Sequence, residues 1–141
     1  MTWKLIVAAS LYASTLTAAG AADLTVIVSG IRNASGSVSA GIYNSATSFP
    51  QASEALALVR IKATPGSVGF TVHNLPPGQY AVAAYHDENG NGRLDIDPTG
   101  APAEGYGVSN NARNPAAPPE FAKAAFELRD QNKSITINIG Y

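Results

Sequence analysis

The stretch LTVIVSGIRNASGSVSAGIY, residues 24–43, decides the fold class, because two strand patterns stand on either side of a turn. In each pattern alternate residues are apolar: Leu24, Val26 and Val28 in the first, and Val38, Ala40 and Ile42 in the second. A period of two is typical of strands that bury one face. The intervening IRNASG tolerates the left-handed backbone of a tight turn, so the sequence predicts a hairpin here.

The rest of the chain repeats this pattern. Further strands are predicted at residues 57–63, 67–75, 79–87, 121–128 and 133–141. Seven short strands separated by turn signals predict an all-β fold, an antiparallel seven-stranded β-sandwich of the immunoglobulin-like, Greek-key type. One helical turn or two is expected within residues 48–57. A long loop is predicted between residues 89 and 120, and loops of that length are often functional.

The N-terminal segment, residues 1–22, has the pattern of a cleaved signal peptide. Lys4 is its one charged residue, an apolar run follows, and Ala19-Gly20-Ala21 fits the small-x-small cleavage rule. The alternative is an N-terminal membrane anchor, which the short, Ala-rich run does not favour. We therefore expect residues 23–141 to form one β-sandwich domain in a periplasmic or secreted protein, with no membrane span after signal cleavage.

Composition excludes several classes of protein. The 141 residues contain no cysteine, so an exported protein of this sequence is not a disulfide scaffold. The formal net charge is -1 and the basic residues are scattered singly, which is not the pattern of a nucleic-acid-binding surface. Hydrophobic packing, with or without a metal ion, must therefore stabilise the domain.

The loop sequence DENGNGRLD, residues 87–95, predicts a calcium site. Its spacing matches the DxNxNGxxD part of a calcium loop, which needs side-chain oxygens at positions 1, 3, 5 and 9 and a backbone carbonyl at position 7. The expected ligands are Asp87, Asn89, Asn91, Asp95 and the carbonyl of Arg93. Gly92 stands at position 6, where the loop must turn sharply. Calcium is preferred over magnesium because a flexible, all-oxygen loop suits the larger ion.

One departure from the calcium-loop pattern needs a second segment. Position 12 should carry a bidentate Glu, but here it is Pro98. Glu104, in PAEGYG just downstream, is predicted to fold back and complete the set of ligands. The alternative is a turn rich in Asp and Asn, in which these side chains cap their own backbone without any metal.

Signals for an enzyme are weak. His86 adjoins Asp87, so a hydrolase acting on carbohydrate or peptide through His86 and nearby carboxylates is the alternative function. No G-x-S-x-G elbow is present, and a cysteine nucleophile is excluded. We expect no enzyme but a binding or structural accessory module of the cell envelope. Its partner would be a protein, a polymer or a small ligand. A binding module would need exposed aromatics such as Tyr106 beside the loop, although buried packing is the commoner position of such a ring.

The segments LPPGQYA, HDENGNGRLD and EGYGVSNNA together resemble a bacterial family known as domain of unknown function 2141. The resemblance covers nearly all of residues 23–141. It implies an exported single-domain β-sandwich related to transthyretin-like and carboxypeptidase-regulatory-like modules, and it implies no established activity. The family pattern includes both the acidic loop and Glu104, which supports the prediction that the two segments act together.

Overall fold

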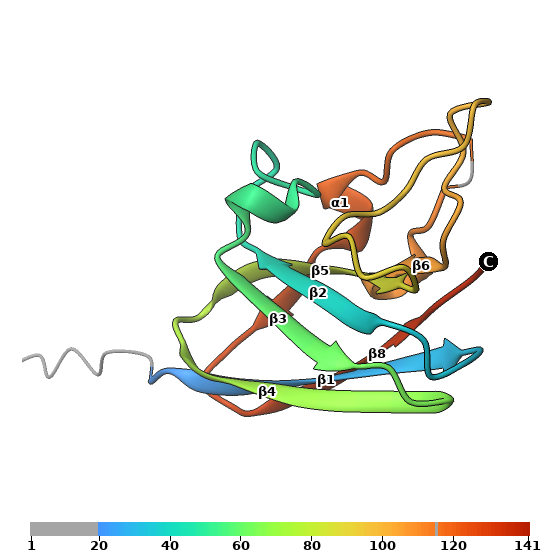
Figure 1. The fold of residues 1–141 in the computed structure, drawn as a ribbon. Coiled ribbons are helices and arrows are strands. Elements are labelled where there is room, and N and C mark those ends of the chain that lie inside the picture. Colours follow the sequence, from blue (N-terminus) through green and yellow to red (C-terminus); the bar gives the residue numbers. More distant parts are fainter. Residues whose placement is uncertain (1–19, 115) are drawn as a thin grey trace, which may run out of the picture.

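The computed structural model describes residues 20–114 and 116–141, and these form a mostly β structure with two sheets (Figure 1). The strands within this part of the chain are β1 (Ala22–Ile31), β2 (Ser37–Tyr43), β3 (Ala57–Lys62), β4 (Gly66–Leu75), β5 (Gly78–Asp87), β6 (Tyr106–Val108), β7 (Phe126–Leu128) and β8 (Lys133–Asn138). The helical turns are η1 (Ala52–Glu54), η2 (Ser109–Asn111) and α1 (Phe121–Ala124). None of the helices in the described residues is long and apolar enough to cross a membrane.

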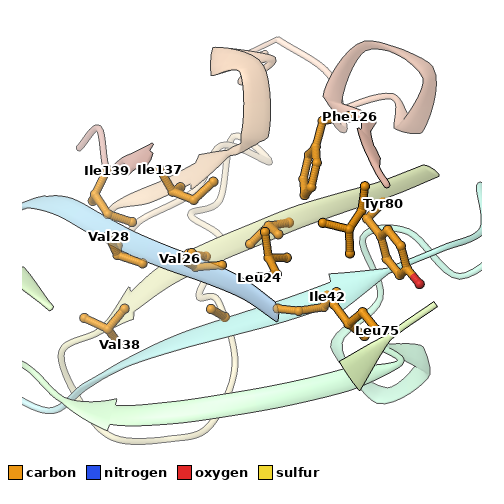
Figure 2. Close-up of a cluster of buried hydrophobic side chains, with 14 of the residues drawn as sticks. Leu24, Val26, Val28, Val38, Ile42, Leu75, Tyr80, Phe126, Ile137 and Ile139 are labelled. Atoms are coloured by element: carbon orange, nitrogen blue, oxygen red, sulfur yellow. The ribbon is translucent and has the colours of Figure 1, made fainter. Parts of the chain in front are cut away.

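The two sheets bury a shared hydrophobic core. One sheet has the strand order β4-β1-β8, and the other has the order β3-β2-β5-β6, with β7 also paired to β5. Alternate residues of β1 point into the space between the sheets and meet Val38 and Ile42 of β2 (Figure 2). Tyr80, Phe126 and Ile137 close the same cluster. The alternation that predicted the strands is thus the alternation that fills the core.

The outer face of the five-stranded sheet is also covered. A second cluster of buried residues there brings Tyr43 and Ala81 of the sheet together with Phe49 and with Ala124 of α1. The rings of Tyr43 and Phe49 meet edge to face, with centroids 5.2 Å apart. Figure 1 shows α1 and the irregular segments on either side of β6 on this face, away from β1, β4 and β8. These covering segments contain the predicted metal loop.

Five of the seven predicted strands are confirmed as β1 to β5, with ends that differ by one or two residues. The predicted strand over residues 121–128 is wrong in its first half, where α1 forms, and right in its second half, which is β7. The final strand ends at Asn138, short of residue 141. A short strand within the predicted loop, β6, brings the number in the described residues to eight. The helical turn expected within residues 48–57 is present as η1.

Two predictions of strand pairing are wrong. β1 and β2 do not form a hairpin: β1 pairs with β4 and β8, whereas β2 pairs with β3 and β5, so the turn between β1 and β2 carries the chain from one sheet to the other. The fold is also not purely antiparallel, because β8 lies parallel to β1. The predicted signal peptide lies almost wholly outside the described residues, and β1 begins at Ala22.

Candidate functional site

The candidate site begins where β5 ends. Asp87 is the last residue of β5, and its side chain is almost fully buried, with 1% exposed. Its carboxylate turns back over the loop: Oδ1 accepts a hydrogen bond from the backbone N–H of Asn91 at 3.1 Å, and Oδ2 accepts one from Gly92 at 2.8 Å. Gly90 and Gly92 adopt φ values of 70° and 81°, a left-handed backbone that favours glycine. The glycines therefore let the loop curl around the Asp87 carboxylate.

The other predicted side-chain ligands gather in the same curl. The side-chain amides of Asn89 and Asn91 both donate to the carboxylate of Asp95, the second of them at 2.7 Å. The amide oxygen of Asn89 accepts the backbone N–H of Asn91 at 3.2 Å, and that of Asn91 accepts the N–H of Arg93 at 3.1 Å. The spacing of these residues along the chain thus brings the side chains of Asn89, Asn91 and Asp95 together, while the Asp87 carboxylate contacts the backbone of the same curl.

Glu104 also comes back to the loop. Its side chain is 7% exposed, and its Oε1 atom accepts the backbone N–H of Glu88 at 3.0 Å. Its Oε2 atom accepts the backbone N–H of Asp95 at 3.2 Å. One carboxylate therefore joins the start of the loop to its far side, and the predicted approach of Glu104 to residues 87–95 is present in the structure.

The acidic side chains of this site differ in whether a basic side chain lies near them. Asp95 has a basic neighbour, with the Nε atom of Arg93 3.6 Å from Oδ1, and Glu88 lies 2.6 Å from Arg32. Hydrogen bonds from the side chains of Asn91 and Asn89 hold the pKa of Asp95 below its ordinary value. Among the described residues, neither Asp87 nor Glu104 forms an ion pair with a basic side chain. Two buried carboxylates are thus held by backbone N–H groups alone.

The arrangement limits how a metal ion could be held. In the part of the chain that the structure describes, no three His, Cys, Asp or Glu side chains come together in a group that could hold a metal. A cation at this loop would therefore need oxygens from Asn89, Asn91 and the backbone in addition to the carboxylates. Calcium, which takes six to eight oxygens of any kind, accepts such a mixed set. The carboxylate of Asp95 would then bind the ion in place of the hydrogen bonds that it accepts from the side-chain amides of Asn89 and Asn91.

His86 is not presented to solvent. It is fully buried, its Nε2 atom lies 2.7 Å from the carbonyl oxygen of Ser35, and its Nδ1 atom lies 2.7 Å from the hydroxyl of Tyr141. A carbonyl oxygen only accepts hydrogen bonds, so Nε2 carries the proton and Nδ1 accepts from Tyr141 when the ring is neutral. Both ring nitrogens are occupied within the protein, and this geometry does not favour the alternative of a hydrolase that uses His86.

Two other polar side chains near the site, those of Tyr106 and Ser109, are held inside the fold. Tyr106, which a binding module would need exposed, is buried: its hydroxyl donates to the carbonyl of Asn114, and Arg113 stacks on its ring. Ser109 is buried, and its hydroxyl links the N–H of Val82 to the carbonyl of Ala124. No local pattern in the sequence indicated these contacts, because the partners of each residue are set by the tertiary fold.

A family model described as "Uncharacterized protein conserved in bacteria (DUF2141)" matches residues 26–136. This range includes the whole of the acidic loop and Glu104. No curated protein and no solved structure matches the chain.

Proposed function

The chain belongs to DUF2141, a family of uncharacterised bacterial proteins, and we propose that it is an exported calcium-binding module of the cell envelope. In this proposal the fold is a transthyretin-like β-sandwich of Greek-key type, delivered to the periplasm or the medium by a cleaved signal peptide. Calcium binds the loop from Asp87 to Asp95 and orders the segment that follows. The module then serves a binding or structural role, without catalysis.

One observation carries the calcium proposal: Asp87 and Glu104 are buried carboxylates that have no basic partner in the described residues. An ionised carboxylate is costly to bury unless it is paired or coordinates a metal. Backbone N–H groups offset part of that cost, since each of the two carboxylates accepts two hydrogen bonds. A divalent cation held with Asn89, Asn91 and Asp95 would offset the remainder.

Thermal unfolding tests the proposal. The protein is melted in EDTA, and then with calcium or magnesium added over the millimolar range. If the dissociation constant lies near 10⁻⁴ M, calcium at a hundredfold excess over it stabilises the folded state by about 2.7 kcal/mol, because the ion binds the native state alone. We expect a clear rise in the melting temperature with calcium and a smaller one with magnesium.

Matched variants give the test its specificity. Asp87→Asn is expected to abolish the calcium response, because it removes the charge at position 1 of the loop. Asp130→Asn, at an exposed turn between β7 and β8, changes the same charge elsewhere and should leave the response intact. A melting temperature that does not respond to millimolar calcium would reject the site and leave DENGNG as a polar turn.

A further inference from the structure

The cover of the five-stranded sheet leaves a cavity of about 810 Å³ between the covering segments and the sheet. Its floor is one row of residues that the strand register places side by side across β3, β2, β5 and β6: Leu58, Gly41, Ala83 and Val108. Its walls come from residues within 92–102, which continue the acidic loop, and from residues 116–119. Pockets that bind small molecules have volumes of roughly 300–1,000 Å³, so this cavity has a suitable size.

Large apolar side chains remain exposed at this cavity. Leu58, from the floor, is 48% exposed, and Ile96, from the loop wall, is 55% exposed. Both side chains are exposed to solvent, whereas neighbouring apolar residues of β2 and β5 are buried. Apolar groups that are left exposed together around a hollow mark a surface that gains free energy when a ligand covers it.

The lining carries almost no free charge. Arg93 is the one charged residue among the described lining residues, and it already lies beside Asp95. Tyr43 and Tyr106 donate their hydroxyl protons to the backbone carbonyls of Pro50 and Asn114, so they present ring atoms to the cavity. Burial raises the pKa of Tyr43 to about 12, and its phenol is therefore neutral at physiological pH.

We propose that this cavity binds an uncharged, mainly apolar small molecule, seated on the row from Leu58 to Val108 and covered by Ile96. The hydroxyl of Tyr85, which lines the cavity and has no hydrogen-bond partner in the described residues, is available to one polar group of the ligand. The inference rests on the proposed binding function and deepens it, because the loop to which we attribute calcium binding supplies one wall of the cavity.

Two fluorescent probes test the proposal. N-phenylnaphthylamine is uncharged and brightens in an apolar site, and anilinonaphthalene sulfonate has the same aromatic scaffold with an added anionic group. Each is titrated into the purified protein, in EDTA and in calcium. We expect saturable binding of the uncharged probe and binding of the sulfonate that is weaker by about tenfold or more, since the one charged side chain among the described lining residues, that of Arg93, already lies beside Asp95.

The chain offers a matched pair of variants. Leu58→Thr introduces a β-branched residue, which suits a strand, but removes an apolar contact. It should weaken binding of the uncharged probe about tenfold. Leu56→Thr changes an equally exposed leucine, 51% exposed, that does not line the cavity, and it should leave the affinity unchanged. Ile96→Thr provides a second lining variant outside the sheet, should Leu58→Thr fail to fold.

The outcomes separate this inference from the calcium proposal. The cavity is supported if the uncharged probe binds saturably and if Leu58→Thr weakens this binding whereas Leu56→Thr does not. This conclusion holds even if calcium does not change the melting temperature. A calcium-dependent melting temperature without saturable probe binding would overturn the cavity alone. Equal effects of the two leucine variants, or tighter binding of the sulfonated probe, would also overturn it.

Discussion

The carboxylate of Glu104 accepts the backbone N–H of Asp95 across the loop, at 3.2 Å, while its other oxygen holds the N–H of Glu88. These residues are far enough apart in the chain that no local turn would bring them together. Through these two hydrogen bonds, Glu104 closes residues 88–104 into one ordered loop. The loop is thus held by two buried acidic side chains, Glu104 across its width and Asp87 at its start.

Glu104→Ala should open this loop. The substitution removes two hydrogen bonds to a charged acceptor and leaves two N–H groups without partners, so we expect a loss of about 2–3 kcal/mol in the free energy of unfolding. Urea denaturation in EDTA measures the loss without a contribution from metal. Glu54→Ala, at an exposed position in η1, is the matched control and should change stability by less than about 0.5 kcal/mol. Equal losses in the two variants would contradict the role of Glu104.

Gly36 and Gly66 both have positive φ but differ in the space around them. Both have positive φ, 65° and 96°, so Ala at either position is strained by about 1–2 kcal/mol. A Cβ at Gly36 would also lie 1.9 Å from the carbonyl oxygen of Asp87, whereas a Cβ at Gly66 meets nothing within 4 Å. Gly36→Ala must therefore displace the first residue of the candidate metal loop.

We expect Gly36→Ala to cost roughly 3 kcal/mol or more, because overpacking adds about 1–3 kcal/mol to the backbone strain. Gly66→Ala should show the backbone strain alone. Denaturant unfolding of both variants measures the difference, and the calcium response of Gly36→Ala should weaken in parallel. Similar losses for the two variants would show that the contact between Gly36 and Asp87 is not tight.

The sequence predicts individual strands better than it predicts their partners. Alternation in β1, β3 and β4 follows from one face being more buried than the other, so it can be read locally. The strands β2 and β5 are buried on both faces but keep apolar residues at alternate positions. Alternation does not say which sheet a strand joins, and this is why the turn between β1 and β2 was assigned to a hairpin. The three-residue strand β6 and the turn α1 are too short to carry a period, and their contacts with the sheet decide their form.

The composition of the candidate metal loop can also be read locally from the sequence. Asp87, Asn89, Asn91 and Asp95 are close in the chain, so their spacing is enough to bring them together. The burial of Asp87 and the orientation of the amide groups depend on the surrounding fold and could not be read from spacing. The pairing of His86 with Tyr141 joins residues far apart in the chain, and neither has a local pattern that reveals the other.

Acid should remove the contribution that the Asp95 carboxylate makes to the free energy of unfolding. Its pKa is held below the ordinary value of 3.8 chiefly by the side-chain hydrogen bond from Asn91, followed by that from Asn89. A carboxyl group with a lowered pKa in the folded state stabilises the fold above the unfolded pKa, and this stability is lost as pH falls through the folded pKa. The stability difference between the wild type and Asp95→Asn should therefore be constant from pH 5 to 7 and shrink below about pH 4.

Urea denaturation in EDTA across this pH range measures the effect. Asp130→Asn serves as the control for a carboxylate at an exposed turn, and its stability difference should remain small throughout. A difference between the wild type and Asp95→Asn that grows as pH falls would have the wrong sign. It would show that the carboxylate of Asp95 is not the favoured partner of the two amides.

Tyr141→Phe should destabilise the protein through His86. The hydroxyl of Tyr141 donates to the buried Nδ1 atom of His86 and accepts the backbone N–H of Arg32 at 3.2 Å. Phe keeps the ring that Arg32 covers, at 4.2 Å from its centroid, but leaves the buried imidazole nitrogen without a partner. An unsatisfied buried acceptor costs about 1–3 kcal/mol, and we expect a loss of that size in denaturant unfolding. Tyr85→Phe is the control, because its hydroxyl has no partner in the described residues, and it should cost less than about 0.5 kcal/mol. If Tyr141→Phe were as stable as Tyr85→Phe, the hydrogen bond to His86 would contribute nothing to the fold, and the histidine would be free to rotate toward another partner.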